Sequence, residues 1–104
     1  MLTENTIIIA DDHSLIRSAL VALLDASTGL SVIADVEDAD KALRETARHR
    51  PDVVVLDIDM PGVDSFQAAA EVRQISPKTE VVFLSGSCSD RFIEAARASG
   101  ACGY

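Results

Sequence analysis

The sequence VVVLDIDMPG, residues 53–62, decides the fold of this chain. Four consecutive apolar residues lead directly into Asp57, and the residues MPG turn the chain shortly afterwards. A short apolar run bounded by turn residues is typical of a strand that is buried on both faces of a parallel sheet. Since ligands of open α/β sheets bind beyond the carboxyl ends of the strands, we expect Asp57 at the edge that carries the chemistry.

Strand-like and helix-like segments alternate along the rest of the chain. The pattern predicts strands at residues 6–10, 30–36, 52–57 and 80–85 and helices at 15–26, 39–49, 65–75 and 91–99, followed by the first residues of a fifth strand at 101–104. Such alternation implies right-handed crossovers and a parallel sheet that is covered by helices on both faces. We therefore expect one α/β domain spanning residues 1–104.

The spacing of apolar residues also predicts which helix residues face the sheet. Ser14 is the expected N-cap of the first helix, and Asp64 or Ser65 that of the third, because their side chains can accept a hydrogen bond from a first-turn amide. The residues expected on inner faces are Ile16, Leu20 and Leu23 or Leu24 in the first helix, Ala39, Ala42, Leu43 and Ala47 in the second, and Phe66, Ala69, Ala70 and Val72 in the third.

Composition narrows the classes of function. With 104 residues, 48% of them hydrophobic, the chain can bury one aliphatic core. Its formal net charge of -8 argues against a nucleic-acid-binding surface. No segment reaches the roughly 18 apolar residues of a membrane helix, and no signal peptide is recognisable.

The cysteines and histidines give no separate signal of function. Cys88 and Cys102 lack metal-ligand spacing and are expected to be reduced thiols, which favours a cytoplasmic location. His13 and His49 are expected to face solvent.

Three acids are expected to meet at the carboxyl edge of the sheet. Asp11 and Asp12 follow the first predicted strand, and Asp57 ends the third, while Ser85 ends the fourth. Two unit charges about 4 Å apart repel by roughly 4 kcal/mol at an effective dielectric constant near 20, so the cluster needs a cation or a proton. An all-oxygen site of this kind suits Mg²⁺.

A divalent ion beside a carboxylate suits phosphoryl transfer, because the ion offsets the charge of the phosphoryl oxygens while the carboxylate attacks phosphorus. Asp57 is the best candidate for the nucleophile, since its strand is central. Asp11 and Asp12 would hold the metal, and Ser85 would donate a hydrogen bond to a phosphoryl oxygen.

Four motifs occur in the order and spacing of one known family. They are the pair Asp11-Asp12, Asp57 followed by MPG, Ser85 after the run VVFL, and GACGY at residues 100–104. Together they resemble the receiver domain of response regulators in two-component signalling, over the whole length of the chain. The resemblance implies a CheY-like, doubly wound fold with strand order 2-1-3-4-5. Residues 9–17 (IADDHSLIR) further resemble the NarL-type branch, whose receivers precede a LuxR-type helix-turn-helix domain.

The resemblance assigns roles to the acids of this constellation. It makes Asp57 the phosphoacceptor and one of the Mg²⁺ ligands. The remaining Mg²⁺ ligands would be Asp11, Asp12 and the backbone carbonyl of Asp59.

The same resemblance implies a switch and a partner. Ser85 would be the hydroxyl that moves toward the phosphoryl group, and Tyr104 the aromatic residue whose rotamer follows it. The phosphoryl donor would be a sensor histidine kinase. The chain would then be a signalling domain in transcription regulation, with no enzymatic activity beyond self-phosphorylation and autodephosphorylation and no direct contact with nucleic acid or membrane.

Three features depart from the family pattern. Family members carry a phosphoryl-pairing lysine shortly after the position of Tyr104, and neither Lys41 nor Lys78 matches it. The fifth strand is a stub and the last helix is absent, so we expect an exposed edge on the fourth strand. We also expect a homodimer that pairs through this edge or through the stub at residues 102–104. Ser65 replaces the usual glycine after Asp64, which predicts backbone strain if this position has a positive φ.

Two other functions stay open at this point. A pseudo-receiver would keep the acids but, lacking the lysine, would act only as an interaction module. A phosphohydrolase of the haloacid-dehalogenase type would use Asp57 and Asp59 as its Asp-x-Asp motif, although that family places the motif on its first strand and not, as here, on the third. Mg²⁺-dependent modification of Asp57 would argue against the first alternative, and turnover of a phosphate ester would favour the second.

Overall fold

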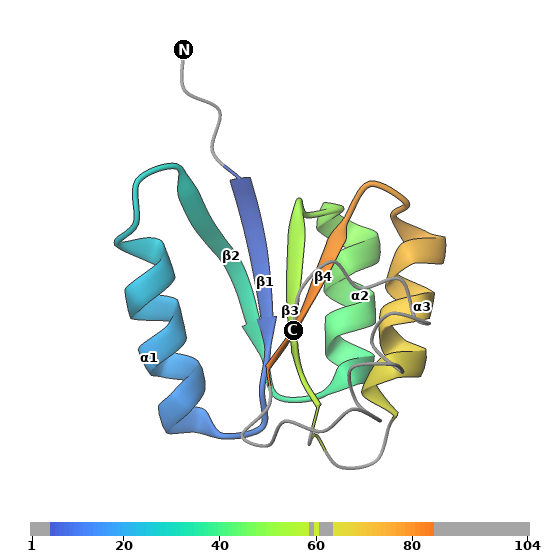
Figure 1. Ribbon diagram of the computed structural model, residues 1–104, viewed down its shortest axis with the longest axis horizontal. Coiled ribbons are helices and arrows are strands. Elements are labelled where there is room, and N and C mark those ends of the chain that lie inside the picture. Colours follow the sequence, from blue (N-terminus) through green and yellow to red (C-terminus); the bar gives the residue numbers. More distant parts are fainter. Residues whose placement is uncertain (1–4, 59, 61–63, 85–104) are drawn as a thin grey trace.

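Four parallel strands form a single sheet in the order β2-β1-β3-β4 (Figure 1). The computed structural model describes residues 5–58, 60 and 64–84. The strands are β1 (Asn5–Ala10), β2 (Leu30–Val36), β3 (Val53–Asp57) and β4 (Glu80–Leu84). The predicted parallel fold and its strand order are therefore confirmed for these four strands. The predicted fifth strand and fourth helix lie outside the described residues.

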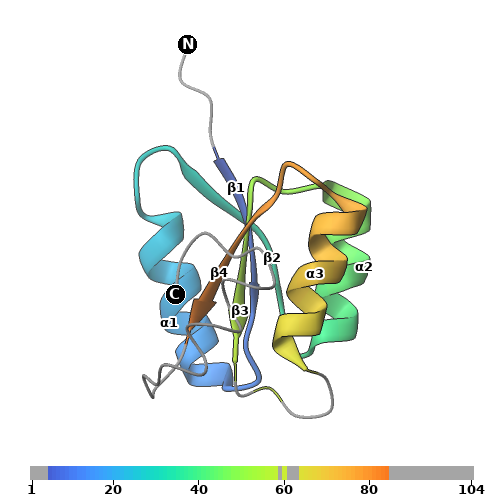
Figure 2. The same ribbon diagram turned by 45° about the vertical axis from the view of Figure 1, so that its right-hand side comes forward.

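Three helices cover the two faces of the sheet. They are α1 (Ser14–Asp25), α2 (Ala39–His49) and α3 (Ser65–Ile75). Helix α1 lies on one face, and α2 and α3 lie side by side on the other, as Figure 1 and Figure 2 show from two directions. In the described part of the chain, no helix combines the length and the apolar character needed to cross a lipid bilayer.

The two central strands supply both halves of the core. Successive side chains of a strand point to opposite faces, so Ile8 and Leu56 pack against α2 and α3 while Ile9 lies on the side of α1. All three are fully buried. Phe83 of β4 completes the core beneath α2 and α3, where its ring meets the edge of Phe66 at a centroid distance of 4.9 Å. This burial on both faces explains why the central strands read as continuous apolar runs.

Helix α1 differs from its prediction at its start and along its inner face. His13, and not Ser14, occupies the N-cap position, and it makes no side-chain capping bond. Ile16 is 49% exposed and Leu23 is 67% exposed, whereas Leu20 and Leu24 pack on the sheet. Within the described part of the chain, α1 packs mainly on β2 and β1, so a narrow stripe of the helix is covered and the residues beside it are exposed.

The inner faces of α2 and α3 also differ from their predictions by single positions. Ala47 and Ala70 are exposed, and Thr46 and Ala68 are buried instead. Thr46 can be buried because its hydroxyl donates to the carbonyl of Ala42 at 2.7 Å, which satisfies its polar atom inside the helix. An apolar-only stripe could not have predicted this choice.

Side-chain caps fix where these two helices begin. The Asp38 carboxylate accepts from the backbone amide of Lys41 at 2.8 Å, and the Asp64 carboxylate accepts from that of Phe66 at 2.9 Å. Of the two residues proposed as the cap of α3, Asp64 is therefore the cap and Ser65 is the first helical residue. Both helices begin at the edge of the sheet that bears the acids.

Two leucine substitutions test this division between core and surface. Leu56→Ala removes a side chain with no exposed surface, and we expect it to lower the free energy of unfolding by about 2–5 kcal/mol. Leu23→Ala removes the same atoms from an exposed position and should change it by no more than about 0.5 kcal/mol. Urea denaturation followed by circular dichroism measures both. Equal losses would contradict the packing of α1 described above.

Candidate metal centre

The pairing of β1 with β3 places two acids side by side. The ladder between these strands is uninterrupted and ends with Ala10 opposite Leu56, so the next residues are Asp11 and Asp57. Both acids are nearly inaccessible, with 2% and 7% of their surface exposed. Asp12, which follows Asp11, keeps 29% of its side chain in solvent. The predicted meeting of these three acids at one edge of the sheet is confirmed.

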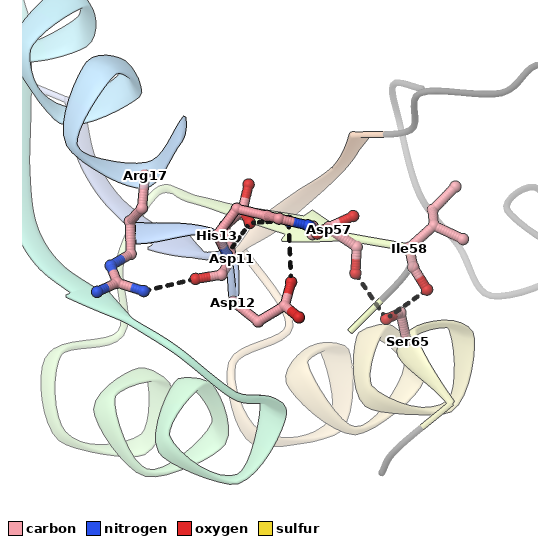
Figure 3. Close-up of polar contacts among 7 residues, drawn as sticks. All are labelled: Asp11, Asp12, His13, Arg17, Asp57, Ile58 and Ser65. Carbon is pink, nitrogen blue, oxygen red and sulfur yellow. Dashed lines mark hydrogen bonds and ion pairs between the residues drawn. The ribbon is translucent and has the colours of Figure 1, made fainter. Parts of the chain in front are cut away.

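The ring of His13 lies among these carboxylates. Its Nδ1 atom is 3.2 Å from an oxygen of Asp11, 3.1 Å from one of Asp12 and 3.6 Å from one of Asp57 (Figure 3). The hydrogen bond with Asp11, together with the negative charges of Asp12, Asp11 and Asp57, raises the pKa of His13 above its usual value. The imidazole nitrogen thus lies within 3.6 Å of an oxygen of each of the three acids.

The sequence analysis missed this role of His13. Its side chain is 58% exposed, in agreement with the prediction that it faces solvent, but its Nδ1 atom points toward the acids. The signal that could have found it is its position directly after Asp11 and Asp12, in the turn that leaves β1. The other histidine, His49, pairs with Glu45 on α2 at 3.0 Å.

Three hydrogen bonds hold the turn after β1 in place. The Asp11 carboxylate accepts from the backbone amide of His13 at 2.8 Å, which closes a local turn. Arg17, one turn into α1, donates to the backbone carbonyl of Asp11 at 2.7 Å and to the carboxylate of Asp35 at 3.0 Å. The guanidinium group therefore ties the end of β1 to β2, and the position of the Asp11 carboxylate depends on it.

Ser65 anchors the opposite side of the site. Its hydroxyl donates to the backbone carbonyl of Asp57 at 2.8 Å and lies 3.3 Å from that of Ile58 (Figure 3). The predicted strain at Ser65 is absent, because among the described residues the only non-glycine residue with a positive φ is Arg50. The serine that replaces glycine here is a buried anchor for the residues around Asp57.

Three of the predicted site residues lie outside the described part of the chain, and both lysines lie away from this cluster. Asp59, Ser85 and Tyr104 lie outside the described residues. Lys41, on the first turn of α2, forms an ion pair with Glu37. Lys78 lies in the loop before β4, where it lines a hollow at the opposite edge of the sheet. These placements agree with the prediction that neither lysine is the phosphoryl-pairing one.

The donor atoms of the cluster fit a divalent cation. One ligand atom each from Asp11, Asp12, His13 and Asp57 can be chosen so that all four lie within 4.8 Å of one another. Three of these atoms are carboxylate oxygens, which are the ligands that Mg²⁺ prefers. A bound cation would also offset the repulsion among these acids, which otherwise works against folding.

The anchoring role of Arg17 gives a direct test. Arg17→Ala should lower the free energy of unfolding by about 1 kcal/mol and should also reduce the extra stability that Mg²⁺ confers, since Asp11 loses its support. The matched control, Asp35→Ala, removes only the exposed carboxylate partner of Arg17 and should leave the effect of Mg²⁺ unchanged. Urea denaturation with and without Mg²⁺ measures both quantities. An equal loss of the Mg²⁺ effect in the control would show that the bond to the Asp11 carbonyl is not the support.

Known proteins match the chain over nearly all its length. The family profile named response regulator receiver domain matches residues 7–104. The probable transcriptional regulatory protein NarL of Mycobacterium tuberculosis is 35% identical over 98 residues, which are 94% of this chain and 45% of NarL. The transcriptional regulatory protein DegU of Brevibacillus brevis is 33% identical over 98 residues, 94% of this chain and 42% of DegU. The chain thus spans less than half the length of these curated relatives.

Solved structures agree with the sequence matches. The signal receiver domain of the putative response regulator NarL from Mycobacterium tuberculosis has a TM-score of 0.91 at 34% identity, covering 97% of this chain and 82% of that one. A LuxR-family two-component response regulator from Aurantimonas sp. SI85-9A1 has a TM-score of 0.92 at 28% identity, covering 98% and 73%. Neither alternative function gains support from these matches. The chain belongs to the response regulator receiver domain family, and its relatives include regulators of the NarL and LuxR type.

Proposed function

We propose that this chain accepts a phosphoryl group on Asp57 from the phosphohistidine of a sensor histidine kinase. The observation that carries the proposal is the close approach of Asp11, Asp12 and Asp57 at the carboxyl edge of a receiver-type sheet. Receiver domains are signalling domains that act with histidine kinases, and a phosphorylated aspartate is the form in which such a domain would carry its signal.

Asp57 is the acid best suited to act as the nucleophile. It ends the central strand β3, whose neighbours β1 and β4 are paired with it on both sides. The hydrogen bond from the Ser65 hydroxyl to its backbone carbonyl holds the Asp57 backbone in place. A carboxylate on a fixed backbone meets an incoming phosphorus atom with little loss of conformational freedom, which favours transfer.

Asp11 and Asp12 fit the role of metal holders. They are adjacent in the chain, and both approach Asp57 through the pairing of β1 with β3. We infer that they bind Mg²⁺ together with Asp57 and with the backbone carbonyl of Asp59. When bound, Mg²⁺ supplies positive charge that stabilises the phosphoryl oxygens during the transfer.

In the transfer, one carboxylate oxygen of Asp57 forms a bond to phosphorus while the bond between phosphorus and the kinase imidazole nitrogen breaks. The product is an acyl phosphate on Asp57, and the released imidazole takes up a proton from water. Self-phosphorylation from a small phosphate donor would follow the same course with a different leaving group. Water attack on the acyl phosphate would return Asp57 to its carboxylate and end the signal.

The similarity to transcriptional regulators suggests a role in the control of transcription. NarL and DegU are named as transcriptional regulatory proteins, and we infer that this receiver controls transcription in the same way, through a DNA-binding region that is not the receiver itself. The switch roles of Ser85 and Tyr104 belong to this proposal. The cytoplasmic location and the homodimer through the edge of β4 stay predictions, and light scattering at several protein concentrations would test the dimer.

Intact mass spectrometry tests phosphorylation directly. After incubation with Mg²⁺ and acetyl phosphate, the chain should gain the mass of one phosphoryl group. Asp57→Ala should abolish the gain because it removes the accepting oxygen. Asp40→Ala, which removes an exposed acid on α2, should leave the gain unchanged.

Metal dependence is the second readout of the same experiment. Removal of Mg²⁺ with a chelator should suppress the mass gain, and Asp11→Asn should do the same without unfolding the chain, as circular dichroism would verify. A mass gain that persists in Asp57→Ala would place the phosphoryl group elsewhere. No gain in a folded chain supplied with Mg²⁺ would count against the phosphoacceptor role and would favour a pure interaction module.

A further inference from the structure

The proposed phosphoryl transfer gives no task to His13, although its ring lies inside the acidic cluster. The Nδ1 atom is within 3.1–3.6 Å of an oxygen of each of Asp11, Asp12 and Asp57. A side chain that is 58% exposed has ample room to turn its ring toward solvent, yet the ring points inward. This arrangement calls for a role that depends on the nitrogen atom itself.

The distances from the imidazole nitrogen to the carboxylate oxygens are close to those between neighbouring ligands of one ion. Neighbouring ligands that each lie about 2.1 Å from a metal are separated by roughly 3.0 Å in an octahedral site and roughly 3.4 Å in a tetrahedral one. The separations of Nδ1 from the Asp12, Asp11 and Asp57 oxygens are 3.1, 3.2 and 3.6 Å. The nitrogen therefore needs only a small adjustment to share a cation with all three acids.

Local backbone structure holds the ring in this position. The amide of His13 donates to the Asp11 carboxylate at 2.8 Å, and the residue itself is extended, at φ -89° and ψ 102°, as the N-cap of α1. Both ends of the residue are thus fixed, one by the Asp11 turn and the other by the start of the helix. Such preorganisation favours ligation, since little freedom is lost when an ion binds.

The chemistry of imidazole determines which ions benefit. Carboxylates alone suit Mg²⁺, whereas imidazole nitrogen prefers first-row transition metals such as Co²⁺, Ni²⁺ and Zn²⁺. A site with three carboxylates and one imidazole should therefore discriminate less in favour of Mg²⁺ than a site of carboxylates alone.

We propose that His13 Nδ1 is a direct ligand that lets the acidic site bind divalent transition-metal ions much more tightly than Mg²⁺. Any proton on Nδ1 leaves to solvent when the ion binds, because a nitrogen ligand must offer its lone pair. The inference rests on the metal site proposed above for Asp11, Asp12 and Asp57. It adds that the identity of the bound ion is decided by His13.

Proton nuclear magnetic resonance with Co²⁺ tests ligation without reference to phosphorylation. The unpaired electrons of Co²⁺ move the ring protons of a ligating histidine far outside the normal spectral range. His49→Ala leaves His13 as the only histidine, and its partner Glu45 lies on α2, apart from the acids. In this background a shifted imidazole signal is expected, and it should vanish in His13→Ala.

Affinities give the second readout. Visible absorption measures Co²⁺ binding, and competition with Co²⁺ measures Mg²⁺ binding. His13→Ala should weaken Co²⁺ binding at least about tenfold, while Mg²⁺ binding should change by less than about threefold. His13→Gln, which keeps a polar side chain of similar length, should behave like the alanine variant. His49→Ala should bind both ions as the unsubstituted chain does.

Different results would overturn different proposals. Unchanged Co²⁺ affinity in His13→Ala, or the absence of a shifted ring signal, would refute ligation by His13. It would not contradict a metal site formed by the three acids. Tighter binding of both ions in His13→Ala would also refute it, and would show that the ring acts as a counter-ion that competes with metals. If neither Co²⁺ nor Mg²⁺ bound the unsubstituted, folded chain, the metal site itself would be overturned. The metal requirement of the proposed function would then be overturned as well.

Discussion

The repulsion among three carboxylates at one edge of the sheet is the constraint on which this structure depends. The ladder between β1 and β3 forces Asp11 and Asp57 together, and chain connectivity adds Asp12. Water cannot screen the two inner acids well, because both are nearly inaccessible. The fold must therefore be stable enough to hold them, and the site must attract positive charge. A divalent cation held by the acids, with the ring of His13 as a further ligand, would offset this repulsion.

The stability that holds the acids comes from apolar burial directly behind them. Residues of β1 and β3 alternate between two layers. The layer under α2 and α3 ends one residue before each acid, at Ala10 and Leu56, and the layer under α1 ends two residues before it, at Ile9 and Val55. The polar anchors are few and local. Arg17 donates to the backbone carbonyl of Asp11, and Ser65 donates to that of Asp57, so each acid is held in part through its own backbone.

The sequence predicted those features that follow from periodicity and chain order. The four strands and the meeting of Asp11 with Asp57 were predictable because buried parallel strands are apolar and end at one edge. The order of the strands was predicted from the resemblance to receiver domains. The exposure of Ile16 was not, because it depends on how little of α1 the sheet covers. The inward ring of His13 was not either, because it depends on a turn that the Asp11 side chain closes. Side-chain contacts of this kind depend on the three-dimensional structure and do not follow from the periodicity of the sequence.

The register of β1 with β2 is interrupted and that with β3 is continuous, which affects where the chain can accept an inserted residue. On the β2 side the register slips by one residue, with Ile7 opposite Val32 and Ile8 opposite Ala34, so that Ile33 is accommodated as an extra residue. On the β3 side the ladder has no such slip. An inserted residue in β1 or β3 would shift one acid by about 3.3 Å and turn its side chain to the opposite face. We therefore expect an insertion or deletion in β2 to disturb the site less than one in β1 or β3, where the acids that follow the strands fix the spacing.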